Sequence, residues 1–129
     1  MKMIRRMFPP ATLALLACSP WAFSSAVAQP AYPSAPIKII VPYPAGGASD
    51  AVARMIGEKL QQAWGQPVYI DNKPGASGII GTQATIKSPA DGYTLLAHNS
   101  VLIQQPAVME KLSFNPFKAL LPVVMTIRT

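Results

Sequence analysis

Two glycine-rich stretches contain the residues of this sequence whose types and spacing could do chemistry. The first is P-Y-P-A-G-G-A-S-D at residues 42–50, and the second is D-N-K-P-G-A-S-G at residues 71–78. Glycine permits positive φ and close approach of a ligand to the backbone. Where such a loop leads from a strand into a helix, free backbone N–H groups and the helix dipole converge and favour an anion. Both stretches therefore predict a site for a small acidic solute.

Neither loop has the pattern of a nucleotide-binding motif. The sequence contains no G-x-x-x-x-G-K-[ST] and no G-x-G-x-x-G, so it indicates neither an NTPase nor a dinucleotide enzyme. A plain turn is the alternative interpretation of each loop, because many strand–helix connections use Gly and Ser only to form the turn. Two such loops at one sheet edge favour binding over the plain turn.

A parallel sheet would bring these loops together. The β-branched run before the first loop predicts a buried strand, and the alternation that follows predicts βαβ crossovers with the loops at the carboxyl edge of one sheet. The predicted elements are strands at 37–41, 68–70 and 93–97, helices at 51–64 and 79–87, a turn at 113–117 and a fourth strand at 121–127. Residues 105–112 are ambiguous, with Pro106 placed to start a short helix. The predicted fold class is α/β.

The first predicted helix carries several specific expectations. Its apolar residues repeat at helical spacing, so we expect Met55 and Trp64 to lie in the core. Arg54 and Glu58 are four residues apart and could form a surface pair. Ser49 and Asp50 come just before the helix, where a side-chain oxygen can cap free N–H groups.

The third predicted strand ends in polar residues that would lie beside the two glycine loops. These are His98, Asn99 and Ser100. His98 is the chain's single histidine, so a metal site built on a histidine cluster is excluded. A structural or hydrogen-bonding role for His98 is favoured over a catalytic one.

Residues 1–28 have the features of a secretory signal peptide. An apolar run at 11–17, too short to span a bilayer, follows a basic start and precedes an A-x-A cleavage site at 26–28. Two alternatives remain for this segment: L-L-A-C resembles a lipobox that would lipidate Cys18, and Arg5-Arg6 resembles a twin-arginine signal. Removal of the leader leaves a mildly basic chain without cysteine, so we expect no nucleic-acid partner and no disulfide.

Three motifs, in order, resemble the Bug-type receptors, the extracytoplasmic solute-binding proteins of tripartite tricarboxylate transporters. They are P-Y-P-A-G-G-A-S-D, D-N-K-P-G-A-S-G-I-I-G-T and P-A-D-G-Y-T-L-L. The resemblance extends from Tyr32 to the end of the chain. It implies a periplasmic, monomeric receptor of the periplasmic-binding-protein type (type II-like), without cofactor, metal or enzymatic activity. Such a receptor has two lobes that close on a small organic carboxylate, which it delivers to the membrane components of the transporter.

The resemblance also implies which residues contact the ligand, largely through backbone groups and ordered water. They are Tyr43, Ala45, Gly46, Ala48, Ser49, Asp50, Gly75, Ala76, Ser77, Gly78, His98, Asn99 and Ser100. The charge of Asp50 would repel a carboxylate, so we expect Asp50 to act as a cap or as an acceptor that orients the loop, or to meet a ligand amino group. Valine at Gly46 or Gly75 is expected to block the ligand while barely changing the thermal midpoint of the empty protein.

The chain is shorter than members of this family. The expectation is a truncated form in which residues 29–129 supply the N-terminal part of lobe one and the second lobe is absent. A non-functional remnant is one alternative. A secreted serine hydrolase using Ser77 or Ser100 with His98 is another, although the loop does not match G-x-S-x-G.

Overall fold

The computed structural model describes residues 31–109 and 112–126. The predicted signal peptide, the lipobox at Cys18 and the Arg5-Arg6 pair lie outside these residues. The strands are β1 (Ile37–Val41), β2 (Val68–Asn72) and β3 (Thr94–Leu96). The helices are α1 (Ala48–Trp64), the short 3-10 turn η1 (Ala76–Gly78), α2 (Ile79–Ile86), α3 (Val101–Val108) and α4 (Pro116–Ala119).

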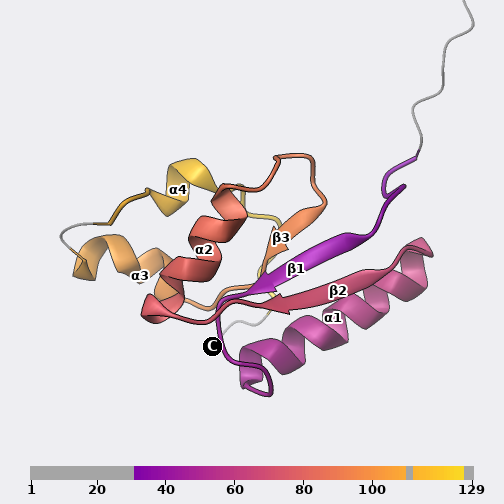
Figure 1. Ribbon diagram of the computed structural model, residues 1–129, viewed down its shortest axis with the longest axis horizontal. Helices are drawn as coiled ribbons and strands as arrows, with labels where there is room; N and C mark the ends of the chain where they lie inside the picture. Colours follow the sequence, from indigo (N-terminus) through magenta and orange to yellow (C-terminus); the bar gives the residue numbers. More distant parts are fainter. Residues whose placement is uncertain (1–30, 110–111, 127–129) are drawn as a thin grey trace, which may run out of the picture.

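The three strands form one parallel sheet in the order β2-β1-β3 (Figure 1). In the register, Ile37 of β1 lies opposite Val68 of β2, and Lys38 lies opposite Thr94 of β3. The central strand is the apolar one, as expected for a strand that is paired on both edges and covered on both faces. The predicted α/β fold with parallel βαβ units is therefore confirmed.

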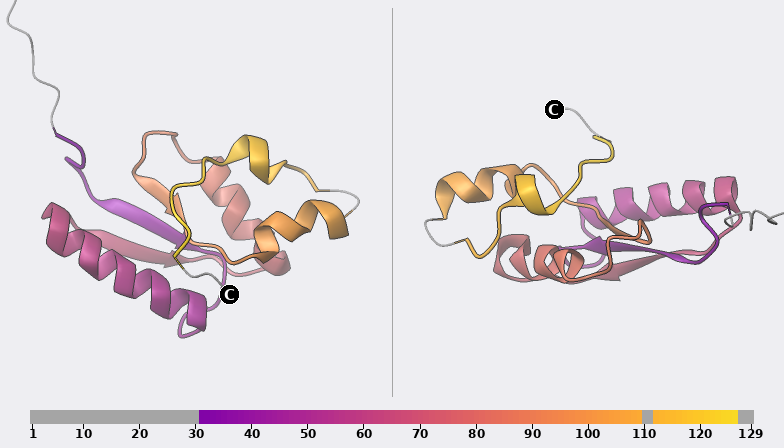
Figure 2. Two further views of the ribbon diagram at one scale, coloured as in Figure 1. Left: turned by 180° about the vertical axis from the view of Figure 1, so that it is seen from behind. Right: turned by 90° about the horizontal axis from the view of Figure 1, so that it is seen from above.

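Helices α1 and α2 cover opposite faces of this sheet, as the right-hand view of Figure 2 shows. On the α1 face, Ile39 and Val41 pack with Ala53 in the buried core. On the other face, Gly81 of α2 lies directly against Pro42: a Cβ built on Gly81 would be 2.7 Å from Pro42 Cβ. The absence of a side chain at Gly81 is what lets α2 approach the end of β1 so closely.

Helix α1 differs from the prediction in its start and in its buried face. It begins at Ala48, three residues earlier than expected, with Gly47 as an extended N-cap. Its buried residues are Asp50, Ala53 and Gly57, whereas Met55 is 64% exposed and Trp64 39% exposed. The expected Met and Trp core is therefore wrong. Small residues allow the helix to lie close to β1 and β2, so the larger apolar residues flank that contact.

The C-terminal part of the described chain also departs from the prediction. The ambiguous region at 105–112 overlaps helix α3, which begins earlier, at Val101, and holds Pro106 in its interior rather than at its start. The predicted turn at 113–117 leads into α4, whose N-cap Asn115 accepts a hydrogen bond from the Phe117 backbone N–H. The predicted fourth strand is wrong for residues 121–126, which pair with no strand within the described ranges and leave Leu121 88% exposed.

Across residues 31–109 and 112–126, no helix combines the length and apolarity that crossing a membrane would require.

Candidate functional site

The three loops predicted to carry the site meet at one edge of the sheet. In Figure 1 the strand arrows end on the same side, and α1, α2 and α3 start there. The Tyr43 hydroxyl of the first loop donates a hydrogen bond to Asn99 Oδ1 of the third at 2.7 Å. Gly78 of the second loop lies against His98, since a Cβ at Gly78 would be 2.6 Å from His98 Nε2. Side-chain and backbone contacts thus join all three loops.

The predicted site residues differ in their accessibility at this edge. Most are exposed, Asp50 and Gly78 are buried, and Tyr43, Ser49, Gly75 and His98 are intermediate. The exposed ones are Ala45, Gly46, Ala48, Ala76, Ser77, Asn99 and Ser100. The exposed residues are open to solvent at the sheet edge, whereas the Asp50 side chain is buried beneath the first loop.

Asp50 holds the first glycine loop in place. Its Oδ2 accepts hydrogen bonds from the Gly46 backbone N–H at 2.8 Å and from Arg54 Nε at 2.9 Å. Its Oδ1 accepts one from Asn72 Nδ2 at 2.9 Å, and Asn72 Nδ2 also donates to the Tyr43 carbonyl. The expected role as an acceptor that orients the loop is therefore present. The expected role as a cap before the helix is wrong, because Asp50 lies within the first turn of α1.

The charge of the buried Asp50 is balanced by Arg54, whose side chain is half exposed. Hydrogen bonds from Arg54, Gly46 and Asn72 hold the pKa of the Asp50 carboxyl well below its usual range. Arg54 forms an ion pair with Asp50 at 2.9 Å. The expected pair of Arg54 with Glu58 is therefore replaced by a pair in the opposite direction along the helix. A neutralised carboxylate repels an approaching anion much less than a free one.

The second glycine loop has an unusual backbone conformation. Gly75 and Gly78 have φ of +133° and +92°, and between them Ala76 and Ser77 have φ of +46° and +53°. Left-handed φ is unfavourable for residues with a Cβ. Two buried side chains engage the loop carbonyls: Thr82 Oγ1 donates to the Gly78 carbonyl at 2.8 Å, and Gln105 Nε2 donates to the Ser77 carbonyl at 2.9 Å.

The expectation that valine at Gly75 would leave the empty protein unchanged is wrong. A Cβ on Gly75 would lie 2.5 Å from Ile80 Cδ1, and the φ of +133° is strained for any L side chain. A Cβ on Gly46 would meet no atom within 4 Å, but its φ of +84° imposes the same kind of strain. The Gly46 N–H is moreover already donated to Asp50. Neither substitution isolates ligand binding from backbone strain.

His98 has the hydrogen-bonding role that was expected. Its Nδ1 lies 3.0 Å from the Asn99 carbonyl oxygen, which can only accept, so Nδ1 carries the proton. Nε2 is then an unprotonated, buried atom that faces Gly78 and has no hydrogen-bond partner among the described residues. Burial lowers the pKa of His98, since the imidazolium would be poorly solvated there. Burial likewise raises the pKa of the Tyr43 hydroxyl, which stays protonated and donates to Asn99.

This arrangement predicts how stability depends on pH. Because the pKa of His98 is lower in the folded than in the unfolded protein, the unfolded state binds its proton first as the pH falls below about 6.5. We expect the thermal midpoint to fall by a few degrees from pH 7 to pH 5, measured by circular dichroism. The variant His98→Gln should show a much flatter profile over this range. A parent profile that is flat between pH 5 and pH 7 would contradict this assignment.

The starts of α1 and α2 supply the anion-binding geometry. Neither helix has a side-chain cap hydrogen bond at its N-terminus: the N-cap residues are Gly47 and Gly78. The first-turn N–H groups of a helix have no acceptor within the helix, and with the dipole they attract negative charge. The Ile79 N–H at the start of α2 is already donated to the Ala76 carbonyl, so the start of α1 and the remaining first-turn N–H groups of α2 are the backbone donors open to a carboxylate.

The alternative of a serine hydrolase has no geometric support in the described residues. None of their hydrogen bonds joins the Ser77 or Ser100 hydroxyl to His98. The topology does bring His98 against Gly78, next to Ser77, which local spacing in the sequence did not suggest. A buried Nε2 without a hydroxyl partner is not placed to activate a nucleophile. In the same residues, no three His, Cys, Asp or Glu side chains cluster in a way that could hold a metal ion.

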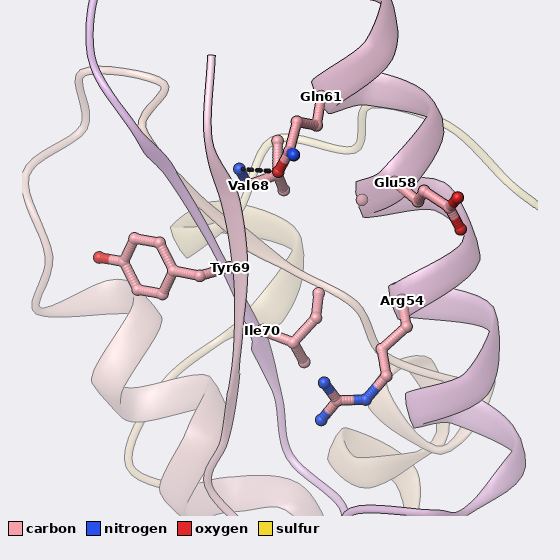
Figure 3. A pocket seen from close by; sticks show the side chains of 7 residues that line it. Arg54, Glu58, Gln61, Val68, Tyr69 and Ile70 are labelled. Carbon is pink, nitrogen blue, oxygen red and sulfur yellow. Dashed lines mark hydrogen bonds between the residues drawn. The ribbon is translucent and has the colours of Figure 1, made fainter. Parts of the chain in front are cut away.

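A groove of about 420 Å³ lies elsewhere, between α1 and the outer edge of β2 (Figure 3). Arg54 and Glu58 line it from the helix, and Gln61 Oε1 accepts a hydrogen bond from the Val68 N–H within it. The side chain of Tyr69 points away from α1. None of the predicted site residues lines this groove, so the loops, and not the groove, carry the predicted binding groups.

Four residues that shape the loops were not among the predicted site residues: Arg54, Asn72, Thr82 and Gln105. Asn72 is the last residue of β2 and stands in the D-N-K-P motif, so its position at a strand end was a usable signal. Thr82 and Gln105 lie in helices and contact the second loop from the interior. Sequence spacing offered no signal for either.

Comparison with known proteins agrees with this fold. The family model "Tripartite tricarboxylate transporter family receptor" matches residues 52–129. Protein BugT of Bordetella pertussis is 45% identical over 101 residues, which cover 77% of this chain and 31% of that protein. A solved structure described as a periplasmic transporter is 40% identical with a TM-score of 0.64, covering 68% of this chain and 30% of the other.

Two further solved structures contain bound ligands. MatC of Rhodopseudomonas palustris, with bound malate, is 30% identical with a TM-score of 0.57 and covers 66% of this chain and 29% of its own. A second R. palustris protein, with adipate, is 40% identical with a TM-score of 0.50 and covers 50% of this chain and 22% of its own. The present chain therefore spans less than a third of the length of each of these relatives.

Proposed function

Since the chain belongs to the tripartite tricarboxylate transporter receptor family, we propose that it serves as the first-lobe part of a receptor for a small carboxylate. In this proposal the loops at 42–50, 73–78 and 98–100 hold the ligand, and a second lobe would complete the cleft. The receptor then delivers the carboxylate to the membrane components of a tripartite tricarboxylate-type transporter.

One observation carries the proposal: two helix starts without side-chain caps lie beside a carboxylate that is already neutralised. Both helices start at the loop edge, where their first-turn N–H groups have no acceptor within the helix, and of these the Ile79 N–H is donated to the Ala76 carbonyl of the preceding turn. Asp50, the acidic residue at this edge, is paired with Arg54 and bonded to Gly46 and Asn72. The edge therefore offers hydrogen-bond donors to an anion without opposing it with an unbalanced negative charge.

The bound ligands of the relatives indicate the chemical class. Malate and adipate are both dicarboxylates, and they occupy structures that share this fold at 30% and 40% identity. We infer that this chain also recognises one carboxylate group of a small organic acid through its loops. Relatives of the family are periplasmic receptors, and we propose that residues 1–28 direct export and are removed before Gln29.

A valine at Gly47 tests the site without straining the backbone. Gly47 has φ −78° and ψ 170°, which any residue can adopt, and the nearest atom to an added Cβ is the Pro44 carbonyl oxygen at 3.5 Å. The branched side chain would stand at the start of α1, where the ligand must approach. We expect the affinity to fall at least tenfold, about 1.4 kcal/mol, while the thermal midpoint changes little.

The binding measurement is isothermal titration with malate and adipate. It is made on the exported chain and on a chimera in which residues 31–126 replace the matching segment of BugT. Ala63→Val, an exposed change in the last turn of α1, is the matched control and should bind like the parent. If Gly47→Val binds both acids as tightly as Ala63→Val, the loop at the start of α1 does not hold the ligand.

A further inference from the structure

The second glycine loop is stabilised from a helix far along the chain. Gln105 lies in α3, 28 residues from Ser77, and its side chain reaches the loop from the interior. It is only 2% exposed, and its Nε2 donates to the Ser77 carbonyl at 2.9 Å. A carbonyl oxygen can only accept, so the amide must present its NH₂ group to Ser77.

The Ser77 carbonyl is held at the most strained part of the loop. Ala76 and Ser77 both have left-handed φ although both carry a Cβ, and such conformations persist only where the surroundings determine them. Thr82 binds the next carbonyl, that of Gly78, and the Gly78 N–H bonds the Gly75 carbonyl. With these carbonyls engaged, Ala76 and Ser77 stay exposed at the sheet edge.

Stability alone does not account for Gln105. Its Oε1 is buried and has no hydrogen-bond partner among the described residues, and a buried acceptor without a partner is unfavourable. A side chain of similar length without polar atoms would remove the bond to Ser77 and this unsatisfied oxygen together. The two effects on stability oppose each other, so an amide here is best explained by what it does to the loop.

We infer that Gln105 is a positioning residue, which fixes the left-handed conformation of residues 76–78 so that the loop presents its backbone donors to the carboxylate. The part of this inference that concerns ligand binding rests on the proposed function, whereas the part that concerns the conformation of the loop does not. Gln105 couples η1, the turn that leads into α2, to α3, two elements that no sequence pattern connects.

The test uses Gln105→Met, which keeps the length of the side chain and removes both polar atoms. Gln104→Met is the matched control, because Gln104 is the exposed neighbour in the same helix. Each variant of the exported chain is measured by isothermal titration with malate and adipate, by thermal unfolding, and by hydrogen exchange of the amides of residues 76–79. We expect Gln105→Met to bind at least fivefold more weakly and to exchange faster at 76–79, with a thermal midpoint equal to or above the parent's. Gln104→Met should match the parent in all three.

Three results for Gln105→Met would overturn the inference. They are an unchanged affinity, unchanged exchange at 76–79, and weaker binding accompanied by a lower thermal midpoint, since the last would mean a general loss of stability. If the parent binds neither acid, the proposed function fails for these ligands. The exchange of the amides at 76–79 then tests the positioning role by itself.

Should Gln105→Met not fold, Gln105→Glu replaces it, since a carboxyl can donate to the Ser77 carbonyl only when protonated. At each pH, the exchange rate of the variant at 76–79 is divided by that of the parent. This ratio should be nearer to one at pH 5 than at pH 8, and a ratio that does not change with pH would overturn the inference.

Discussion

Alanine in place of Gly81 is expected to lower the thermal midpoint by about 10 °C, a net loss of about 2 kcal/mol. The added Cβ would lie 2.7 Å from Pro42 Cβ, 2.9 Å from Pro42 Cα and 3.0 Å from the Lys73 carbonyl oxygen. Two of these atoms belong to the backbone, so α2 itself must move. In an ordinary helix the same substitution would stabilise the protein by about 1 kcal/mol, and the expected sign is therefore the reverse of the usual one.

Gly57→Ala in α1 is the matched control for this prediction. Its Cβ would be 3.3 Å from Val68 Cγ1 and 3.5 Å from Ile70 Cδ1, which are methyl groups at the ends of side chains and can shift. The gain in helix propensity offsets this contact, so we expect a change within about 1 kcal/mol. Circular dichroism melts of both variants give the comparison. Equal melting temperatures for Gly81→Ala and Gly57→Ala would show that α2 is not held against Pro42 as described.

Asn in place of Asp50 is expected to lower the thermal midpoint by an amount on the order of 5–10 °C. The neutral amide cannot balance Arg54, and one of its two terminal atoms becomes a donor facing other donors. The Gly46 N–H or the Asn72 amide then loses its acceptor, so the first loop is held less firmly and the fold is less stable. We therefore expect weaker binding of malate and adipate in the same variant.

Asp71→Asn is the control, because Asp71 pairs with Lys73 at 3.2 Å with both side chains about one-third exposed or more. A surface pair of this kind contributes about 0.5 kcal/mol. The pH dependence gives a second check. The pKa of Asp50 is lowered by folding, so its contribution is present above the unfolded value of about 4 and is lost as the pH falls below it. Asp50→Asn should lack this acid-side loss, and an unchanged acid profile would contradict the assignment.

Local sequence patterns were sufficient for β1, β2, β3 and the glycine loops. A run of β-branched residues followed by Pro42 and two glycines identifies β1 and its loop within a few residues, and Gly65 ends α1 in the left-handed conformation expected after a helix. These features depend on the backbone conformations that β-branched residues, proline and glycine allow locally. The alternation of strands and helices predicted that the strands are parallel, and parallel strands bring the three loops to one edge of the sheet.

Features that depend on packing between distant segments could not be read in the same way. The buried face of α1 turns toward Ala53 and Gly57 because the helix approaches the sheet closely, a distance that apolar periodicity does not encode. The contact between Gln105 and Ser77 requires that α3 pack against the second loop, although the two residues are 28 positions apart. A strand at 121–126 requires a partner edge as well as apolar residues, and composition reports only the latter.

The central place of β1 also sets an order for folding during synthesis. Every ladder hydrogen bond of this sheet has β1 as one partner, yet β2 begins only at Val68 and β3 only at Thr94. The most apolar strand is thus made first, and its two edges gain their partners only after β2 and then β3 have been translated. Non-local pairing of this kind forms slowly. If the chain is exported as we propose, that delay would keep the polypeptide unfolded for translocation, at the cost of an exposed apolar segment that chaperones must shield.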